Sequence, residues 1–136
     1  MLSKKSLAVI LAAIIIFIII ASQIASAKSN YIDGSTNAKR ILYLKSIGVE
    51  VASENVSSKR ILIPEKFNDI YNNYNTMQKQ AGFDLSHFKG KKATIYTYSL
   101  NSEYNVNIIV CEDRIIGGDI AALNINGEMK PLCNKK

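Results

Sequence analysis

The hydrophobic residues of this chain follow three patterns, and the first is an unbroken run near the N-terminus. Residues 7–21 are all apolar and carry no charge. A helix built from them would be apolar on every face, which does not suit the surface of a small globular domain. The run therefore predicts a segment that interacts with a membrane, either as a signal peptide or as an anchor.

The second pattern is a helical period that begins after residue 34. Ser35 or Thr36 can cap a helix, and Gly48 supplies the left-handed conformation that often ends one. Between them, side chains that recur three or four positions apart form one stripe: Ala38, Ile41, Leu42, Leu44, Lys45 and Ile47. This spacing predicts a short amphipathic helix.

A longer helix is predicted after Pro64, which suits the first turn of a helix because it has no N–H to satisfy. Gly82 is expected to end it. Its apolar face consists of Phe67, Ile70, Tyr71, Tyr74, Met77 and Ala81. We expect this aromatic face to pack against a sheet.

The third pattern is the β-rich remainder of the chain. Glu112-Asp113 and Asn126-Gly127 are placed in tight turns, and Gly117-Gly118 at a bulge. Strands are expected at 49–51, 60–63, 93–100, 104–111 and 129–132, and a further strand at 114–116 is expected to continue at 120–125 after the two glycines. Together these patterns predict an α+β fold, with two helices packed on an antiparallel sheet of about four to five strands after an N-terminal apolar segment.

The flanks of the apolar run predict where the domain is located. Lys4 and Lys5 precede the run and Ala25-Ser26-Ala27 follows it, which is the layout of an export signal. Cleavage after Ala27 would release the protein, whereas an uncleaved segment would anchor it in the cell membrane through residues 7–25. In both cases the lysines stay inside and the domain lies outside the cytoplasm. The chain then divides into a signal peptide or transmembrane anchor (1–27), a linker (28–34) and a small domain (35–133).

Charge narrows the class of partner. The chain has 17 Lys and Arg against 11 Asp and Glu, which gives a net charge of +6. The basic residues are scattered and form no stripe with interleaved aromatic residues, so a nucleic-acid partner is not predicted. The charge fits either an ordinary solvated surface or weak attraction to anionic wall polymers or lipid headgroups.

Cys111 and Cys133 are the two cysteines of the chain. Outside the cytoplasm they could pair in a disulfide, or each could serve as a small apolar residue. Neither lies near residue 27, which argues against a lipid anchor.

An ordered series of short features runs through the exported part: Ile63-Pro64, Phe67, Tyr71, Tyr74-Asn75, Gln78, Gly82-Phe83-Asp84-Leu85, Lys89-Gly90-Lys91, Tyr96-Thr97-Tyr98 and Ile116-Gly117-Gly118-Asp119-Ile120. The series resembles the domain-of-unknown-function family 4830 over about residues 37–132. The resemblance implies a small exported or membrane-anchored domain of a low-GC Gram-positive bacterium, with no established activity. The chain departs from the family pattern at Glu112-Asp113, where a turn like Asn-Gly is usual, and at Glu128, where an aromatic residue is expected.

Five side chains are the candidate binding residues: Asp84, His87, Tyr96, Tyr98 and Asp119. Asp84 and His87 could bind a metal, but a zinc site needs three or four ligands, and no metal site, cofactor or catalytic residue is predicted. The two tyrosines could form an aromatic face that binds sugar or peptide, or they could pack in the core with hydrogen-bonded hydroxyls. Asp119 is expected to accept backbone N–H bonds at a bend.

Three hypotheses for function follow. The first is a non-enzymatic module that binds an envelope protein or an anionic wall polymer at the outer surface of the membrane. The second is a small envelope-acting hydrolase or transferase, which would need a cleft with a paired acid and base drawn from Asp84, His87 and Asp119. The third is a structural or inhibitory partner of a membrane complex, which co-purification would reveal.

Overall fold

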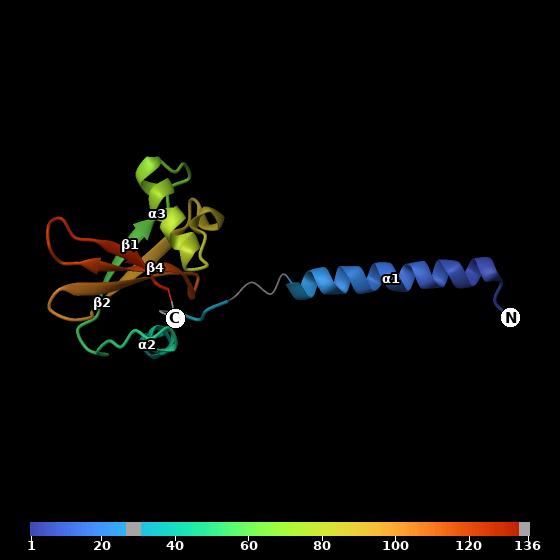
Figure 1. Cartoon of the computed structure of the whole chain (residues 1–136), viewed down its shortest axis with the longest axis horizontal. Coiled ribbons are helices and arrows are strands. Elements are labelled where there is room, and N and C mark those ends of the chain that lie inside the picture. Colours follow the sequence, from blue (N-terminus) through green and yellow to red (C-terminus); the bar gives the residue numbers. More distant parts are fainter. Residues whose placement is uncertain (27–30, 134–136) are drawn as a thin grey trace. The chain divides into compact units, whose positions relative to one another are not determined.

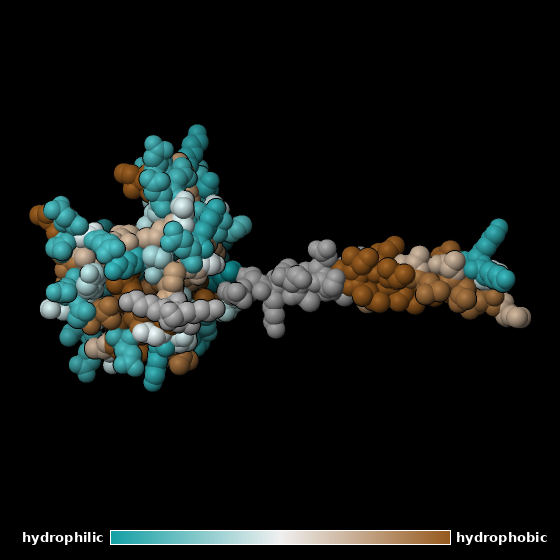
Figure 2. Space-filling model, viewed as in Figure 1, coloured by the Kyte–Doolittle hydropathy of each residue, from teal (hydrophilic) through white to brown (hydrophobic). Residues whose placement is uncertain are grey.

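The computed structural model describes residues 1–26 and 31–133, and it separates the chain into two compact units, Met1–Tyr31 and Ile32–Lys136. The first unit contains the helix α1, Lys4–Ser26. Ser3 caps this helix by accepting a 3.1 Å hydrogen bond from the Ser6 amide. The surface of α1 is apolar over most of its coloured length and polar at its N-terminal end (Figure 2). The predicted cleavage site at Ala27 and residues 28–30 of the predicted linker lie outside the described residues.

No helix in the described ranges is both long enough and apolar enough to cross a membrane.

The second unit has the predicted α+β architecture, with a five-stranded antiparallel sheet whose strands follow chain order (Figure 1). The prediction of two helices after an apolar segment was incomplete, because the apolar segment is itself helical and the described chain contains three α-helices. The elements of this unit are α2 (Asn37–Ser46), β1 (Ser57–Leu62), α3 (Asp69–Gln80), the 3₁₀ helix η1 (Leu85–Phe88), β2 (Lys92–Ser99), β3 (Tyr104–Cys111), β4 (Arg114–Ala122) and β5 (Met129–Pro131).

Helix α2 begins and ends at the expected residues. The Thr36 side chain accepts a hydrogen bond from the Lys39 amide, and Gly48 has a φ of 80°. The Val49 amide donates to the Leu44 carbonyl at 2.9 Å, which completes a Schellman motif. This bond commits Val49 to the helix end, so the strand predicted at 49–51 is absent. Leu44 is buried, whereas Leu42, which the stripe had included, is 67% exposed.

Helix α3 begins later than predicted. Asn68 is its N-cap and accepts a 2.9 Å bond from the Tyr71 amide, so Pro64 lies before the helix. Asn and Asp side chains cap well because they replace a missing backbone acceptor, a role that proline cannot fill. The predicted apolar face also needs correction, because Ile70 is 76% exposed while the polar residues Asn75 and Gln78 are buried.

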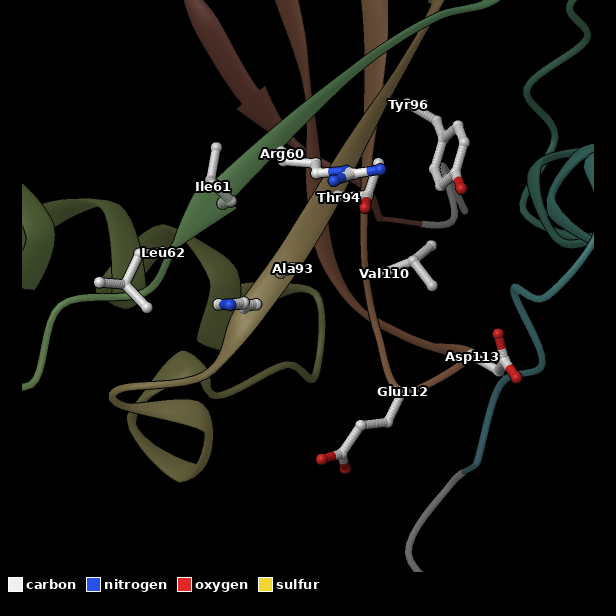
Figure 3. Close-up of a pocket in the computed structure, with 10 residues that line it drawn as sticks. Arg60, Ile61, Leu62, Ala93, Thr94, Tyr96, Val110, Glu112 and Asp113 are labelled. Atoms are coloured by element: carbon white, nitrogen blue, oxygen red, sulfur yellow. The ribbon is translucent and has the colours of Figure 1, made fainter.

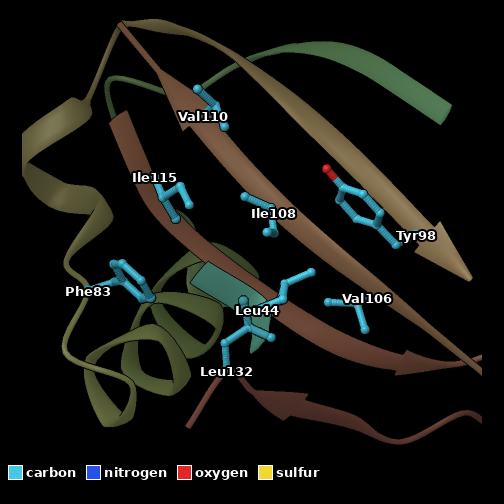
Figure 4. Close-up of a cluster of buried hydrophobic side chains, with 8 residues drawn as sticks. All are labelled: Leu44, Phe83, Tyr98, Val106, Ile108, Val110, Ile115 and Leu132. Atoms are coloured by element: carbon cyan, nitrogen blue, oxygen red, sulfur yellow. The ribbon is translucent and has the colours of Figure 1, made fainter. Parts of the chain in front are cut away.

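Helices α2 and α3 cover opposite faces of the sheet (Figure 1). On the α2 face, Leu44 packs with residues that alternate along β2, β3 and β4, including Tyr98, Val106, Ile108 and Ile115 (Figure 4). The other face packs against α3 and η1 with a second set: Ile63, Leu85, Ala93, Ile109, Cys111 and Ile116. The sheet is therefore the central layer. Its buried strand residues point alternately to the α2 side and to the α3 side.

A bulge interrupts the pairing of β3 with β4, close to the predicted site. Val110 pairs with Ile115 but Ile109 pairs with Gly117, so Ile116 is the extra residue. A Cβ on Gly118 would lie 2.3 Å from the Asn107 carbonyl oxygen and 2.4 Å from Leu132 Cδ1. Glycine is required there because neighbouring atoms approach closely. The strand that was predicted to continue past the glycines is β4, and it ends at Ala122, before the expected residue 125.

Candidate functional site: a charged pocket on the sheet face that packs against α2

The α2 face of the sheet continues across β2 to the edge strand β1, where it forms a pocket of about 620 Å³ (Figure 3). The antiparallel register places Arg60 opposite Thr94 and Leu62 opposite Lys92, so all four side chains belong to this face. Residues two apart on a strand share a face, which adds Tyr96 to the same surface. The pocket floor therefore combines cationic, hydroxyl, aromatic and apolar groups.

Two cations of the pocket lack a protein counter-ion. Within the described ranges, neither Arg60 nor Lys92 forms an ion pair with a carboxylate. Both residues are exposed, so they are solvated and available to a ligand. The register makes Arg60 and Lys92 diagonal neighbours on this face. A guanidinium and an ammonium on one face suit a carboxylate or a phosphate, because the guanidinium can donate two parallel hydrogen bonds and the ammonium adds a point charge.

Tyr96 is held against a third cation. The guanidinium carbon of Arg40 lies 3.5 Å from the centroid of the Tyr96 ring, a close cation–π contact. Arg40 is only 5% exposed, and it donates to the Tyr98 hydroxyl at 2.9 Å and to the Gly34 carbonyl at 2.8 Å. These bonds fix the guanidinium with neutral acceptors, so its positive charge contributes to the potential around Tyr96.

The pocket is also lined by two acidic residues of the β3–β4 turn, Glu112 and Asp113. Glu112 and Asp113 have φ values of 50° and 61° in a two-residue connection, as in a type I′ turn. The turn therefore keeps the geometry that Asn-Gly would give. Lys91 lies 3.1 Å from a Glu112 carboxylate oxygen and balances its charge.

The predicted candidates Asp84 and His87 lie at the start of η1 and within it. Asp84 is the N-cap of η1, and it accepts bonds from the Ser86 amide at 2.9 Å and from the Asn75 side chain at 2.9 Å. Burial opposes ionisation, but the hydrogen bonds from Asn75 and Ser86 outweigh it and hold the pKa of the Asp84 carboxyl well below its usual range. The His87 side chain is 76% exposed, with Nε2 3.7 Å from Asp84 Oδ2. This pair therefore caps a turn, and no group of three or more potential metal ligands occurs among the described residues.

Asp119 lies in a buried network between the sheet and α3. It is 3% exposed, and it accepts a 2.6 Å hydrogen bond from the Tyr74 hydroxyl and a 2.8 Å hydrogen bond from the side-chain amide of Asn107. The expectation that it accepts backbone N–H bonds was therefore wrong, because its partners are side chains. Beside it, Gln78 exchanges two hydrogen bonds, each of 2.9 Å, with the backbone of Gly118. These contacts dock α3 on β4 and leave Asp119 with no open surface.

The two candidate tyrosines have different environments although they share a face. Tyr98 is 1% exposed, and its hydroxyl donates to Asn37 Oδ1 at 2.8 Å, so it is a core residue. Tyr96 is half-buried and lines the pocket. Cys111 and Cys133 are free thiols in the structure, and their Sγ atoms contact different carbonyls, those of Lys92 and Gln80.

Sequence reasoning missed Arg60, Lys92 and Arg40. The alternation of Lys92, Thr94, Tyr96 and Tyr98 was the available signal for one half of the pocket. The register that brings Arg60 to Thr94 joins segments far apart in the chain, so the basic residues look scattered in the sequence alone.

A comparison with known families decides the classification. The model of a domain of unknown function, DUF4830, matches residues 43–120, which is more than half of the chain. The chain belongs to the DUF4830 family. The match confirms the predicted resemblance, although it is shorter than the expected range of about 37–132. No curated protein and no solved structure matches the chain.

Proposed function

We propose that this DUF4830 domain is a non-enzymatic binding module at the cell envelope, and that it binds anionic groups in the charged pocket. The observation that carries the proposal is the pair Arg60 and Lys92, which share one face with Tyr96 and have no carboxylate partner in the described part of the chain. Unpaired cations next to an aromatic ring fit a carboxylate or a phosphate ligand.

The extracytoplasmic location in this proposal rests on the sequence. Lys4, Lys5, the apolar run and Ala25-Ser26-Ala27 have the order of an export signal or signal anchor. The family resemblance implies a Gram-positive envelope. In such an envelope, carboxylate-bearing proteins and phosphate-bearing wall polymers are the two sources of the ligand chemistry.

The chemistry of the pocket favours binding over catalysis. Its polar lining consists of cations, the two carboxylates of the turn, the Thr94 hydroxyl and the Tyr96 phenol. A hydrolase would need a nucleophile or a water activated by a neighbouring base. The carboxylates that could act as a base in this lining, Glu112 and Asp113, stand on a turn where Glu112 is paired with Lys91 at 3.1 Å. The acid–histidine pair at Asp84 and His87 belongs to a different surface, where Asp84 is occupied by capping bonds.

The test is a calorimetric titration of the full chain, in a neutral detergent, with poly-L-glutamate and separately with poly(glycerol phosphate). Arg60→Gln and Lys92→Gln should each weaken binding about tenfold, since each removes one charge-assisted contact. Lys45→Gln is the matched control because it removes one charge from the exposed end of α2, and it should change binding by less than about twofold.

The comparison between the two polymers identifies the source of the anion. Equal losses in all three variants, or no binding of either polymer, would contradict the proposal. Shortening of a polymer during the titration would instead favour the hydrolase.

A further inference from the structure

The sheet has two edges with different properties. β5 has three residues, Met129–Pro131, and ends in proline, which cannot donate to a further strand. β1 has six residues, Ser57–Leu62, and pairs only with β2 among the described elements. A regular open strand of this length is a template for another extended segment.

The outward hydrogen-bonding groups of β1 can be assigned from its register. The Ile63 amide donates to the Lys91 carbonyl at 2.9 Å, so the backbone of Ile63 faces β2. In an antiparallel pair this orientation alternates, and the backbone groups of Ser58, Arg60 and Leu62 therefore face away from β2. In the described chain no hydrogen bond to these groups is seen, which leaves three donors and three acceptors along the edge.

The charges on β1 determine what can pair there. Lys59 and Arg60 are adjacent and exposed, and they point to opposite faces of the strand. A second copy of β1 would place like charges close together, which is unfavourable in a cross-strand pair. An acidic strand would place its carboxylates opposite these cations, with about 4.5–5.5 Å between the Cβ atoms of opposite residues.

We infer that an extended acidic segment of a protein partner adds to the outer edge of β1 as a further strand of the sheet. This inference rests on the proposed anion-binding function and specifies its ligand. One acidic side chain of the segment lies opposite Arg60 on the pocket face, and a second lies opposite Lys59 on the other face. Leu62 is 62% exposed on the pocket face and accepts an apolar side chain two positions from the first acid.

The recognised pattern is therefore two adjacent acidic residues, with an apolar residue two positions beyond the acid that faces Arg60. Backbone pairing supplies affinity, and the alternate side chains supply specificity. Figure 3 shows Arg60 and Leu62 on the edge strand with Thr94 and Tyr96 beyond them, so side chains of the added strand would extend the rim of the pocket.

The main test uses the unmodified full chain and synthetic peptides, and Arg60→Gln is the one variant of the chain, used to detect the anion-binding pocket. The probes have the core Val-Thr-Glu-Glu-Thr-Ser or its reversal, which cover the antiparallel and parallel directions. Each is also made with backbone N-methyl groups at alternate residues, in the two phases. Strand addition predicts that one phase weakens binding by at least about tenfold because it removes amide donors, while the other leaves binding within about threefold.

The outcomes separate the two proposals. Equal affinity for both methylated phases, with a loss on Arg60→Gln, would overturn strand addition and retain an anion-binding pocket. Binding of poly(glycerol phosphate) without binding of any peptide would also overturn strand addition and point to a wall polymer. A peptide with lysines in place of both glutamates is the charge control, and binding of that peptide as tight as the acidic one would overturn the inference. Failure of every anion to bind would contradict both proposals.

Discussion

The phenolic hydroxyl of Tyr74 donates a 2.6 Å hydrogen bond to Oδ2 of Asp119 and so joins α3 to β4. Asp119 is almost fully buried, and the side chain of Asn107 donates to its other carboxylate oxygen at 2.8 Å. Burial raises the pKa of the Asp119 carboxyl, although the bonds from Tyr74 and Asn107 oppose the shift. The same burial, together with the nearby carboxylate, raises the pKa of Tyr74. The pair therefore works as a donor and an acceptor that hold a helix on a sheet.

Removal of the Tyr74 hydroxyl should destabilise the domain. Tyr74→Phe keeps the ring but leaves a buried carboxylate oxygen without a donor, which typically costs about 1–3 kcal/mol. His87→Ala is the control, because its side chain is 76% exposed and a surface change of this kind stays within about 0.5 kcal/mol. Urea unfolding of both variants measures the two costs. Equal losses of unfolding free energy in the two variants, or a larger loss in His87→Ala, would contradict this account and would mean that the His87 side chain stabilises the fold.

The buried carboxylate of Asp119 and the capping carboxylate of Asp84 should change the free energy of unfolding with pH in opposite directions. The pKa of Asp119 is raised in the folded state, so its contribution to stability falls as the pH rises above the ordinary value of 3.8. The pKa of Asp84 is lowered, so its contribution is present above 3.8 and is lost as the pH falls below it. Unfolding free energies of the natural chain, Asp119→Asn and Asp84→Asn between about pH 2 and pH 7 test this. The difference between the natural chain and each variant should slope in opposite directions, and parallel slopes would contradict the assignment.

Gly118 should tolerate no side chain, because of its contacts. In Gly118→Ala the new Cβ would meet the Asn107 carbonyl oxygen and Leu132, and overpacking of this kind costs about 1–3 kcal/mol or more. Gly48→Ala is the matched control, since Gly48 has a φ of 80° and a Cβ there would have no atom within 4 Å, so only the left-handed conformation is penalised. Thermal melting compares the two. Gly48→Asn should recover most of the control's loss, whereas Gly118→Asn should recover none.

The second compact unit should fold without α1 and without metal. Both hydrophobic clusters lie within Ile32–Lys136, and no metal-ligand cluster occurs in its described residues. A chain that begins at Ile32 should melt cooperatively and at the same temperature with and without a chelator. A large chelator-induced loss would reveal a structural metal.

The hydrophobic pattern predicted the elements better than their packing. Thr36, Gly48 and Gly82 marked helix ends because caps depend on neighbouring backbone atoms only. The burial of Gln78 could not be predicted in the same way, because its partner Gly118 is 40 residues away and becomes a partner only through the fold. The prediction that Ile70 lies on the buried face of α3 was wrong, because it is 76% exposed. Periodicity identifies an apolar stripe, but it does not tell which side of a helix meets the sheet.

The candidate site depends even more on register. Arg60 and Lys92 are distant in sequence, and they share a face because β1 pairs with β2 in the register that sets Arg60 opposite Thr94. The sequence offered Tyr96 as one of five candidate binding residues, with core packing as the alternative, and it is the one of the five that lines the pocket in the described part of the chain. A single shift of register would move Arg60 to the opposite face of the sheet.

The most direct test of the central claim locates the ligand on the domain. In amide NMR spectra of the full chain in a neutral detergent, titration with poly-L-glutamate or poly(glycerol phosphate) should shift the signals of Arg60, Thr94 and Tyr96. The amides of Asp84 and His87 should stay in place, because they belong to a separate surface. Shifts confined to Asp84 and His87, with Arg60, Thr94 and Tyr96 unchanged at saturation, would contradict the claim that the charged pocket binds anions.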